Sequence, residues 1–460
     1  MVAARTLPEL NQRFADNHSW DILPVYAREL IATVVHERLV TPQQFADGAP
    51  IDDGETDATP AFAAALADLK SKGGGALFLP PAAVGYLVGP ADGSLFTIDF
   101  PCDIFGTGLQ SRILAAPGFG EFSNIFLQTG DHCTFRNFYM NLDPSGGHSN
   151  CGRGINPQGT SAGILSDVAI SGVRIDHARR AGVRCEGFNN RVEHVRITDC
   201  IFYDCRASLA LDGTIFDCTM QSVDIWEPWA DGGISIDRLT AGTTSRAINI
   251  KGVNIFNSLV PSGGNQAAIR GRMEDSVISG VVIDVGVASG VGMSLASSQR
   301  LSVQDVNIRQ RETGTGTGLA VLGLGDSLIT GVKVSGFGTG VNGDANTTNN
   351  KFQNNDFSGN TNNFGSALGA GNIRRNNAGY VTENKGTATI PSDGTSVTFA
   401  HGLSVTPAVQ DFSLSFSSNP LANVVGVPWI SNITSTEVTV SVPSWPGGSG
   451  WTFGWRVEVL

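Results

Sequence analysis

One short apolar phrase recurs along the middle of the chain and constrains the fold more than any other feature. Each copy, such as VAISGVRI at residues 168–175, alternates apolar and polar residues around one valine, and successive valines are 22 to 30 residues apart. The aligned residues are Val173, Val195, Val223, Val253, Val281, Val306 and Val332. A period of roughly 20 to 50 residues is typical of solenoids and propellers. The chain therefore contains a structural repeat.

A second column of apolar phrases lies between the copies of the first and keeps a similar spacing. Its phrases open at Val183, Leu209, Ile234, Ala267, Met293 and Leu319. Each repeat thus holds two or three short strands joined by Gly, Asn and Asp turns, with no helical stretch between them. A propeller blade would need a longer unit of four strands. The pattern therefore predicts an all-β chain built on a single-stranded parallel β-helix.

Composition disfavours several classes of partner. The chain carries 42 acidic and 30 basic side chains, a net charge of −12, and no run of Lys or Arg, which argues against nucleic acid and anionic membrane surfaces. Its seven cysteines lack ligand spacing, so we expect small buried thiols rather than zinc sites or disulfides. Neither a signal-peptide pattern nor a membrane-length apolar run is present. We expect no membrane insertion and folding in a reducing cytoplasm.

The segments on either side of the repeat differ from it. An apolar helical face predicts a helical attachment or oligomerisation segment over residues 1–44. The parallel β-helix is expected over residues 45–380, with a capping helix near 57–70 that covers its open end. The Asn-rich run 346–365 is expected to form β-helix turns with stacked amides. Alternating β-branched and aromatic residues predict an antiparallel β-sandwich over residues 386–460.

The opening of the predicted β-helix carries a family resemblance. Residues 45–89 contain a Gly-Ala pair, an acidic DG, the phrase TDAT, an Ala-rich helix, GGG and a strand that ends in Pro. This order closely resembles the opening of the pectate-lyase-like right-handed β-helix superfamily, particularly phage tailspikes and polysaccharide depolymerases. The usual Pro-x-Gly-x-Tyr phrase has two extra residues here, between Pro80 and Tyr86. The resemblance implies a homotrimeric virion spike, made in the host cytoplasm, that contacts other virion proteins through residues 1–44.

The last segment carries a second resemblance. Its phrases GTATIP and HGL are similar to those of small C-terminal domains of phage tail and tailspike proteins, which assist trimerisation or bind glycans. Its tryptophans would then pack in the sandwich core or at subunit contacts, or would stack on sugars. These tryptophans are Trp429, Trp445, Trp451 and Trp455.

Outward side chains at equal positions of successive rungs form columns about 4.8 Å apart. In the second column the outward residues are predicted to be Glu186, Asp212, Asp237 and Arg270. Glycoside hydrolysis needs two carboxyl groups about 5–5.5 Å or about 6.5–9.5 Å apart, which makes this set the catalytic candidate. Two alternatives stay open. The carboxylates could hold Ca²⁺ while an arginine abstracts a proton, as in lyases of the superfamily, or the column could be a structural ladder relieved by arginines.

The phrase DIWEPWADGG lies beside this column and offers flat rings and hydrogen-bond acceptors, which suit a sugar. The substrate-binding candidates are Trp226, Glu227, Trp229, Asp231 and Arg184. A turn whose two tryptophans pack against the barrel is the alternative. In an earlier turn, His177, Arg179 and Arg180 either read acidic sugars or are simply solvated.

These features predict a tailspike-like virion spike that binds and depolymerises a bacterial surface polysaccharide, capsule or O-antigen, during host attachment. The reaction would be that of a glycoside hydrolase or a polysaccharide lyase. A non-catalytic receptor-binding spike that only adheres to capsule is the alternative. A secreted bacterial lyase or hydrolase is a further alternative, which the flanking domains and missing signal peptide disfavour. No metal or other cofactor is expected, apart from Ca²⁺ if the protein is a lyase.

Overall fold

The computed structural model describes the chain from residue 38 onward, with gaps. The described residues are 38–146, 151–161, 163–236, 245–260, 266–312, 314–365, 368–416, 428–443 and 450–459. The expected helical segment over residues 1–44 therefore lies almost wholly outside the described residues. The chain divides into two compact units, residues 1–258 and 259–460.

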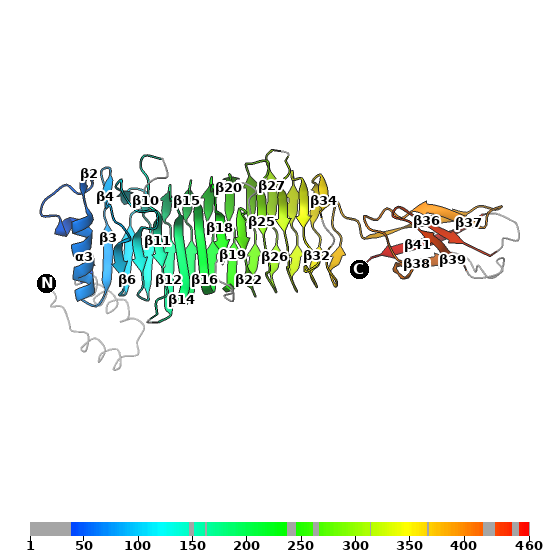
Figure 1. The fold of residues 1–460 in the computed structure, drawn as a ribbon, viewed down its shortest axis with the longest axis horizontal. Helices are drawn as coiled ribbons and strands as arrows, with labels where there is room; N and C mark the ends of the chain where they lie inside the picture. Colours follow the sequence, from blue (N-terminus) through cyan, green and yellow to red (C-terminus); the bar gives the residue numbers. More distant parts are fainter. Residues whose placement is uncertain are drawn as a thin grey trace, which may run out of the picture. The chain divides into compact units, whose positions relative to one another are not determined.

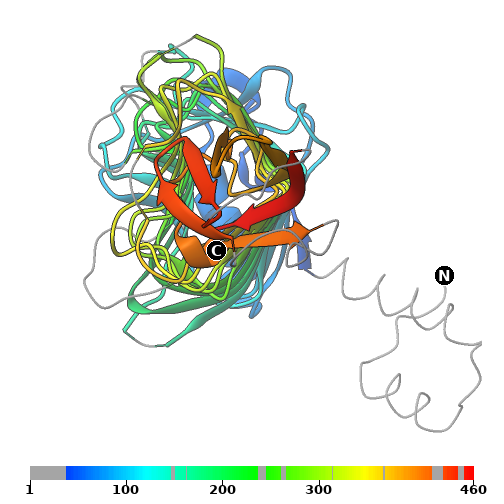
Figure 2. The same ribbon diagram turned by 90° about the vertical axis from the view of Figure 1, so that its right-hand side faces the viewer.

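The first unit is a stack of parallel strands arranged as three walls (Figures 1 and 2). Wall 1 contains β1 (Leu39–Val40), β3 (Gly75–Leu79), β6 (Cys102–Gly106), β9 (Cys133–Arg136), β12 (Leu165–Ser171), the second halves of β14 (Ala181–Thr198) and β16 (Ala207–Gln221), and β19 (Ser245–Lys251). Wall 2 contains β2 (Asp53–Asp57), β4 (Gly85–Val88), β7 (Arg112–Ala115), β10 (Tyr139–Asn141), β13 (Arg174–Asp176), β15 (Ile201–Tyr203), β17 (Asp224–Trp226) and β20 (Asn254–Ser258). Wall 3 contains β5 (Ser94–Ile98), β8 (Asn124–Gln128), β11 (Arg153–Pro157), the first halves of β14 and β16, and β18 (Gly232–Ile236).

The apolar columns of the sequence are the inward faces of these walls. In wall 3, Ile155, Val183, Leu209 and Ile234 are register partners on successive strands, and all four are fully buried. Because side chains alternate between the two faces of a strand, the residues between them point outward. The register of the core thus fixes which polar residues line up outside.

The helix α3 (Thr59–Ser71) lies at the end of the stack that carries the first strands (Figure 1). Its buried Phe62 stacks on Phe96 at 5.5 Å between ring centroids and meets Tyr86 edge-on at 5.6 Å. Such a helix covers strand edges that would otherwise be unpaired. The short helix η1 (Pro42–Phe45) precedes it.

The second unit begins with parallel strands and then changes architecture. Its parallel strands are β21 (Ile269–Gly271), β22 (Met273–Glu274), β23 (Val277–Ser279), β24 (Val282–Val285), β25 (Val291–Ser294), β26 (Ser302–Gln304), β27 (Asn307–Gln310), β28 (Thr317–Ala320), β29 (Leu328–Thr330), β30 (Lys333–Ser335), β31 (Thr339–Asn342), β32 (Lys351–Gln353), β33 (Asp356–Gly359), β34 (Asn362–Phe364) and β35 (Ile373–Arg375). In its turns, Asn350 donates to Asn372 at 3.0 Å and Asn355 donates to Asn377 at 2.9 Å. The predicted stacking of amides is confirmed.

Two antiparallel three-stranded sheets follow in the same unit. One contains β36 (Glu383–Ile390), β41 (Trp451–Glu458) and β38 (Phe412–Phe416), and the other contains β37 (Ser396–Ala400), β40 (Glu437–Ser441) and β39 (Trp429–Ile433). The short helix η2 (Val409–Asp411) precedes β38. Trp451 and Trp455 are buried in the core of this part, whereas Trp429 is exposed. Parallel β-helix and C-terminal antiparallel β-sandwich are both confirmed.

All seven cysteines are free and buried, as expected for small apolar side chains. Burial raises their pKa, for example that of Cys133 to about 11 and that of Cys218 to about 12. Among the described helices, none has both the length and the apolar character to cross a membrane.

Candidate functional site

Glu186 and Asp212 lie side by side on the outer face of wall 3. They are register partners on β14 and β16, one position after the inward pair Cys185 and Leu211. The Nε atom of Arg184 lies 2.9 Å from Glu186 Oε1 and 2.8 Å from Asp212 Oδ2. The two oxygens can be no farther apart than the sum of these distances. This closeness suits the shorter carboxyl spacing of glycoside hydrolysis, about 5–5.5 Å.

The pair is enclosed rather than open. The side chains of Glu186 and Asp212 are 9% and 8% exposed. Arg153 Nη1 lies 3.5 Å from Glu186 Oε1, and Asn156 donates to Glu186 Oε2 at 3.4 Å. A buried ion pair needs such surrounding partners, because both charges have lost their hydration. Contact with a polymer would require the side chains around the pair to move.

The predicted catalytic column has two further residues, Asp237 and Arg270. Asp237 lies outside the described residues. Arg270 lies on β21 in the second unit, where it is buried and is the register partner of Ser294 on β25. Of the four predicted catalytic residues, Glu186 and Asp212 are therefore the ones that the described structure brings together.

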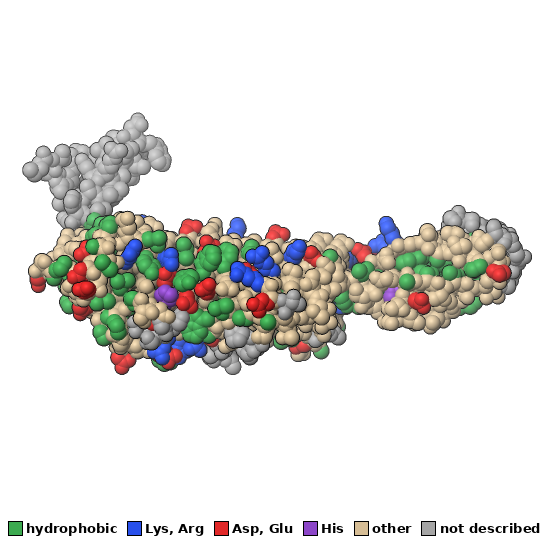
Figure 3. Space-filling model, turned by 90° about the horizontal axis from the view of Figure 1, so that it is seen from above, with side chains coloured by type: hydrophobic (Ala, Val, Ile, Leu, Met, Phe, Trp, Pro, Cys, Tyr) green, Lys and Arg blue, Asp and Glu red, His purple; other side chains and the backbone are tan. Residues whose placement is uncertain are grey.

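Trp226 belongs to an aromatic column on the outer face of wall 2. Tyr203, Trp226 and Phe256 are register partners on β15, β17 and β20, and the Trp226 and Phe256 rings stack at 4.2 Å. Trp226 is 42% exposed. Figure 3, seen from above Figure 1, shows hydrophobic side chains gathered among acidic and basic ones on the molecular surface. Tyr203 and Phe256 were missed from sequence. Phe256 stands three residues after the repeat residue Val253, as Trp226 does after Val223, whereas Tyr203 stands eight residues after Val195.

The other predicted substrate-binding residues are divided between this column and the neighbouring turn. Glu227 accepts a hydrogen bond from Asn257 at 3.3 Å, and its charge, followed by burial, raises the pKa of Tyr203. Trp229 and Asp231 lie in the turn between walls 2 and 3, where both meet Arg206. The Arg206 guanidinium is 6.0 Å from the Trp229 ring centroid, and its Nε is 2.8 Å from Asp231 Oδ2. The two tryptophans of the phrase DIWEPWADGG thus lie in different places. Trp226 is on the outer face of wall 2, and Trp229 is in the turn between walls 2 and 3.

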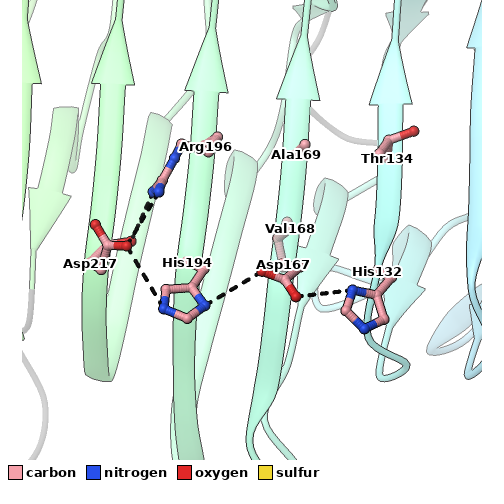
Figure 4. Close-up of a pocket in the computed structure, with 8 residues that line it drawn as sticks. All are labelled: His132, Thr134, Asp167, Val168, Ala169, His194, Arg196 and Asp217. Carbon is pink, nitrogen blue, oxygen red and sulfur yellow. Dashed lines mark hydrogen bonds and ion pairs between the residues drawn. The ribbon is translucent and has the colours of Figure 1, made fainter. Parts of the chain in front are cut away.

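A second polar arrangement lines a surface pocket of about 580 Å³ on wall 1 (Figure 4). We call His132, Asp167, His194 and Asp217 the histidine row. Asp167 contacts His132 Nδ1 at 2.9 Å and His194 Nδ1 at 3.4 Å, and Asp217 lies 3.9 Å from His194 Nε2. Imidazole and carboxylate side chains are the usual groups of general acid–base catalysis, so this row also has the side chains for acid–base chemistry.

The histidine row could not be recognised from the sequence, because a backbone requirement also explains His and Asp at these positions. All four residues have φ between 51° and 58°, a left-handed conformation in which His, Asp and Asn are enriched. The available sequence signal is positional. Each residue immediately precedes an inward residue of its wall 1 strand, at Cys133, Val168, Val195 and Cys218.

Among the described residues, no group of three or more His, Cys, Asp or Glu side chains has an arrangement that could hold a metal ion. The side chains of Glu186 and Asp212 are instead bound by arginines. The described site thus presents arginine–carboxylate ion pairs.

No family model and no curated protein sequence matches this chain. Among solved structures, the A-module of mannuronan C-5 epimerase AlgE6 of Azotobacter vinelandii is similar with a TM-score of 0.52 at 14% identity, over 73% of this chain and 98% of that chain. The tailspike protein gp49 of Pseudomonas phage LKA1 is similar with a TM-score of 0.48 at 12% identity, over 91% and 100% of the two chains. The epimerase module confirms the parallel β-helix as a fold.

Proposed function

We propose that this protein is a virion spike that binds a bacterial surface polysaccharide and depolymerises it during host attachment. The observation that carries the proposal is the aromatic column of Tyr203, Trp226 and Phe256. Rings on neighbouring strands, about 4.8 Å apart, form an apolar stripe along the stack, in which Trp226 stacks on Phe256 and is itself 42% exposed. Sugar rings pack on exposed aromatic side chains while nearby polar groups bind their hydroxyls.

Polar groups of the required kind lie beside the column. Asp224 and Asn254 are register partners at the start of β17 and β20, and Asn254 donates to Asp224 at 2.9 Å. Glu227 follows Trp226 directly and retains further acceptor capacity beyond its bond from Asn257. An elongated glycan can therefore meet rings and acceptors together.

In this proposal Glu186 and Asp212 are the catalytic carboxyl groups. One would protonate the leaving glycosidic oxygen, and the other would attack the sugar carbon or assist a water molecule. Arg184 would hold both in place. The resemblance of residues 45–89 to phage tailspikes supports the assignment to a homotrimeric spike, attached to other virion proteins through residues 1–44. Ca²⁺ enters only if the reaction is that of a lyase.

A non-catalytic spike is the second candidate, and one observation favours it. Glu186 and Asp212 are enclosed and share Arg184, which is what a structural ladder requires. Such a protein would adhere to capsule through the aromatic column without cleaving it. A secreted bacterial polysaccharidase remains a further proposal, with the same binding surface.

The binding proposal is tested with a matched pair of tryptophan variants. Trp226→Ala should weaken binding to purified bacterial capsules and O-antigens by about two- to tenfold, because a stacked ring contributes about 0.5–1.5 kcal/mol. Trp429→Ala, at a tryptophan that is 47% exposed in the β-sandwich, should leave affinity unchanged. Surface plasmon resonance measures both. Loss of binding in Trp429→Ala alone would move the binding site to the sandwich.

A further inference from the structure

Three arginines converge on one carboxylate at the turn between walls 2 and 3. Arg180 Nη2 lies 2.8 Å from Glu121 Oε1, while Arg179 and Arg206 approach the same carboxylate at 3.8 Å and 3.9 Å. Arg206 also pairs with Asp231 at 2.8 Å. These arginines come from two successive rungs of the solenoid.

The backbone explains why the arginines gather there. The N–H of Arg180 donates to the carbonyl of Gly152, and the N–H of Arg206 donates to that of Ala178. The N–H of Asp231 donates in turn to the carbonyl of Arg206 at 2.9 Å. Successive turns therefore stack, and basic residues at equivalent turn positions lie over one another.

Arg153 supplies a separate observation that points to a ligand. Its side chain is only 9% exposed, and its Nε is buried without a hydrogen-bond partner. Its nearest acceptors, Asn124 Oδ1 and Glu186 Oε1, each lie 3.5 Å from Nη1. Burial, and then the charge of Arg184, lower the pKa of Arg153. A buried donor without an acceptor is costly, and an anion at this place would meet it.

An exposed aromatic ring lies between these arginines. Phe122 is 59% exposed, and the guanidinium groups of Arg180 and Arg153 lie 4.3 Å and 6.0 Å from its ring centroid. Apolar rings of this size are normally buried. Here the ring places a flat apolar face next to two cations, which suits a sugar that carries a negative charge.

Basic side chains are concentrated in this part of the described chain. Five arginines, 153, 179, 180, 184 and 206, pair with the carboxylates of Glu121, Glu186, Asp212 and Asp231. This concentration contrasts with the net charge of −12 of the chain as a whole and suits a negatively charged ligand.

We propose that this turn is a subsite for an acidic sugar. Arg179, Arg180 and Arg206 bind the carboxylate of a uronic acid, and Phe122 packs against the face of its ring. A planar guanidinium matches a carboxylate with two parallel hydrogen bonds. Arg153 connects this subsite to Glu186. The inference rests on the proposed function, because it names the substrate class of the same surface.

The first experiment removes the charge from the sugar. Purified uronic-acid-bearing capsular polysaccharides are compared with their carboxyl-reduced forms, in which each carboxylate becomes a primary alcohol. The native chain should bind the acidic form at least about tenfold more tightly than the reduced form. The Arg179→Gln/Arg180→Gln variant should lose this preference and bind both forms alike. The matched control is Arg136→Gln, which breaks an arginine–Asp103 pair on wall 1.

The outcomes separate the subsite from the proposed function. Equal binding of acidic and reduced polymers, or unchanged preference in the double variant, overturns the subsite while polysaccharide binding stands. Absence of binding to any polysaccharide overturns the proposed function. In that case saturation-transfer NMR with D-glucuronate and D-glucose tests the subsite by itself. A stronger signal for glucuronate is expected, and equal signals overturn the subsite. If the double variant does not fold, Phe122→Ala tests the same preference at an exposed side chain.

Discussion

Arg184 determines how Glu186 and Asp212 can act, because its Nε contacts both carboxylates within 2.9 Å. A guanidinium in this position keeps two like charges together and orients them. It also occupies one oxygen of each carboxylate. Glu186 Oε2 accepts a hydrogen bond from Asn156 at 3.4 Å, and in the proposed reaction it is the Glu186 oxygen that would meet a substrate. Arg184 is thus a positioning residue in the proposed reaction.

We expect the isosteric double substitution Glu186→Gln/Asp212→Asn to lower depolymerisation by about 100-fold or more, because a carboxamide neither protonates the leaving oxygen nor attacks the sugar. Reducing-end release and the absorbance of unsaturated uronate measure the rate for a hydrolase and a lyase. The matched control is Asp167→Asn/His194→Gln in the histidine row. If the control loses activity and the first variant does not, the reaction centre lies on wall 1.

The seven buried thiols make stability depend on alkaline pH. Burial raises their pKa from the ordinary value of 9.0, to about 11 for Cys133 and about 12 for Cys151, Cys200 and Cys218. Above pH 9 the unfolded chain releases thiol protons that the folded chain retains. Stability is therefore full below pH 9 and falls as pH rises toward 11 or 12, by up to about 1.4 kcal/mol per pH unit for each thiol.

Denaturant unfolding between pH 8 and 11 measures this dependence. Cys218→Ala removes one buried thiol and should flatten the decline by the share of one group, whereas Asp393→Asn, at an exposed position, should leave it unchanged. An unfolding midpoint that stays constant to pH 11 would contradict the assignment of the pH dependence to buried thiols.

At the residue scale, the sequence predicted that Glu186 and Asp212 are neighbours but not that their side chains are buried. The alternation of Cys185 and Leu211 with Glu186 and Asp212 was sufficient to place the two carboxylates together. Their burial depends on side chains from other rungs, including Arg153. The alternation of residues within one column does not indicate these side chains. The histidine row was concealed for another reason, since its left-handed backbone already accounts for His and Asp at those positions.

At the scale of elements, β14 and β16 are distinguished by running through a corner. Their 18 and 15 residues span from wall 3 to wall 1, with a register shift between Gly187 and Val192. They carry the carboxylate pair at one end and His194 with Asp217 at the other. The repeat placed the apolar phrases at Val183 and Leu209 in register correctly, but it aligned Val195 with Val173 and Val223, whereas the register partners of Val195 are Val168 and Cys218. It did not predict the continuity of either strand, because periodicity marks inward residues and carries no information about the corner.

The corner depends on glycine. Gly213 has φ +84°, and a Cβ there would lie 2.6 Å from the backbone of Gly187. We expect Gly213→Ala to lower stability by about 1–3 kcal/mol through backbone strain, and to impair both ends of β16. Gly163→Ala is the matched control, since a Cβ there meets nothing within 4 Å. Thermal unfolding followed by circular dichroism compares the two, and equal midpoints would show that the corner tolerates a side chain.

At the scale of the whole molecule, the parts whose local sequence specifies their structure were predicted best. The helix expected near residues 57–70 is α3, Thr59–Ser71, because proline in its first turn and glycines after it define its ends. The amide stacking of Asn350 with Asn372 follows from residue type and repeat position. The oligomeric state could not be predicted in this way, because it depends on the outer surface of the protein and not on the period of the sequence repeat. The homotrimer therefore stays a prediction.

The homotrimer prediction can be tested at two exposed phenylalanine rings. Phe188 and Phe216, on β14 and β16, are each 40% exposed, and large apolar side chains that stay exposed are candidates for an interaction surface. We expect sedimentation equilibrium to give three times the 48.2 kDa chain mass. Phe188→Ser/Phe216→Ser should shift the distribution toward single chains if these rings lie at the subunit contact. Leu109→Ser, at another exposed apolar residue, should not. A native mass of one chain contradicts the trimer, and an unchanged trimer in the double variant moves the contact away from this corner.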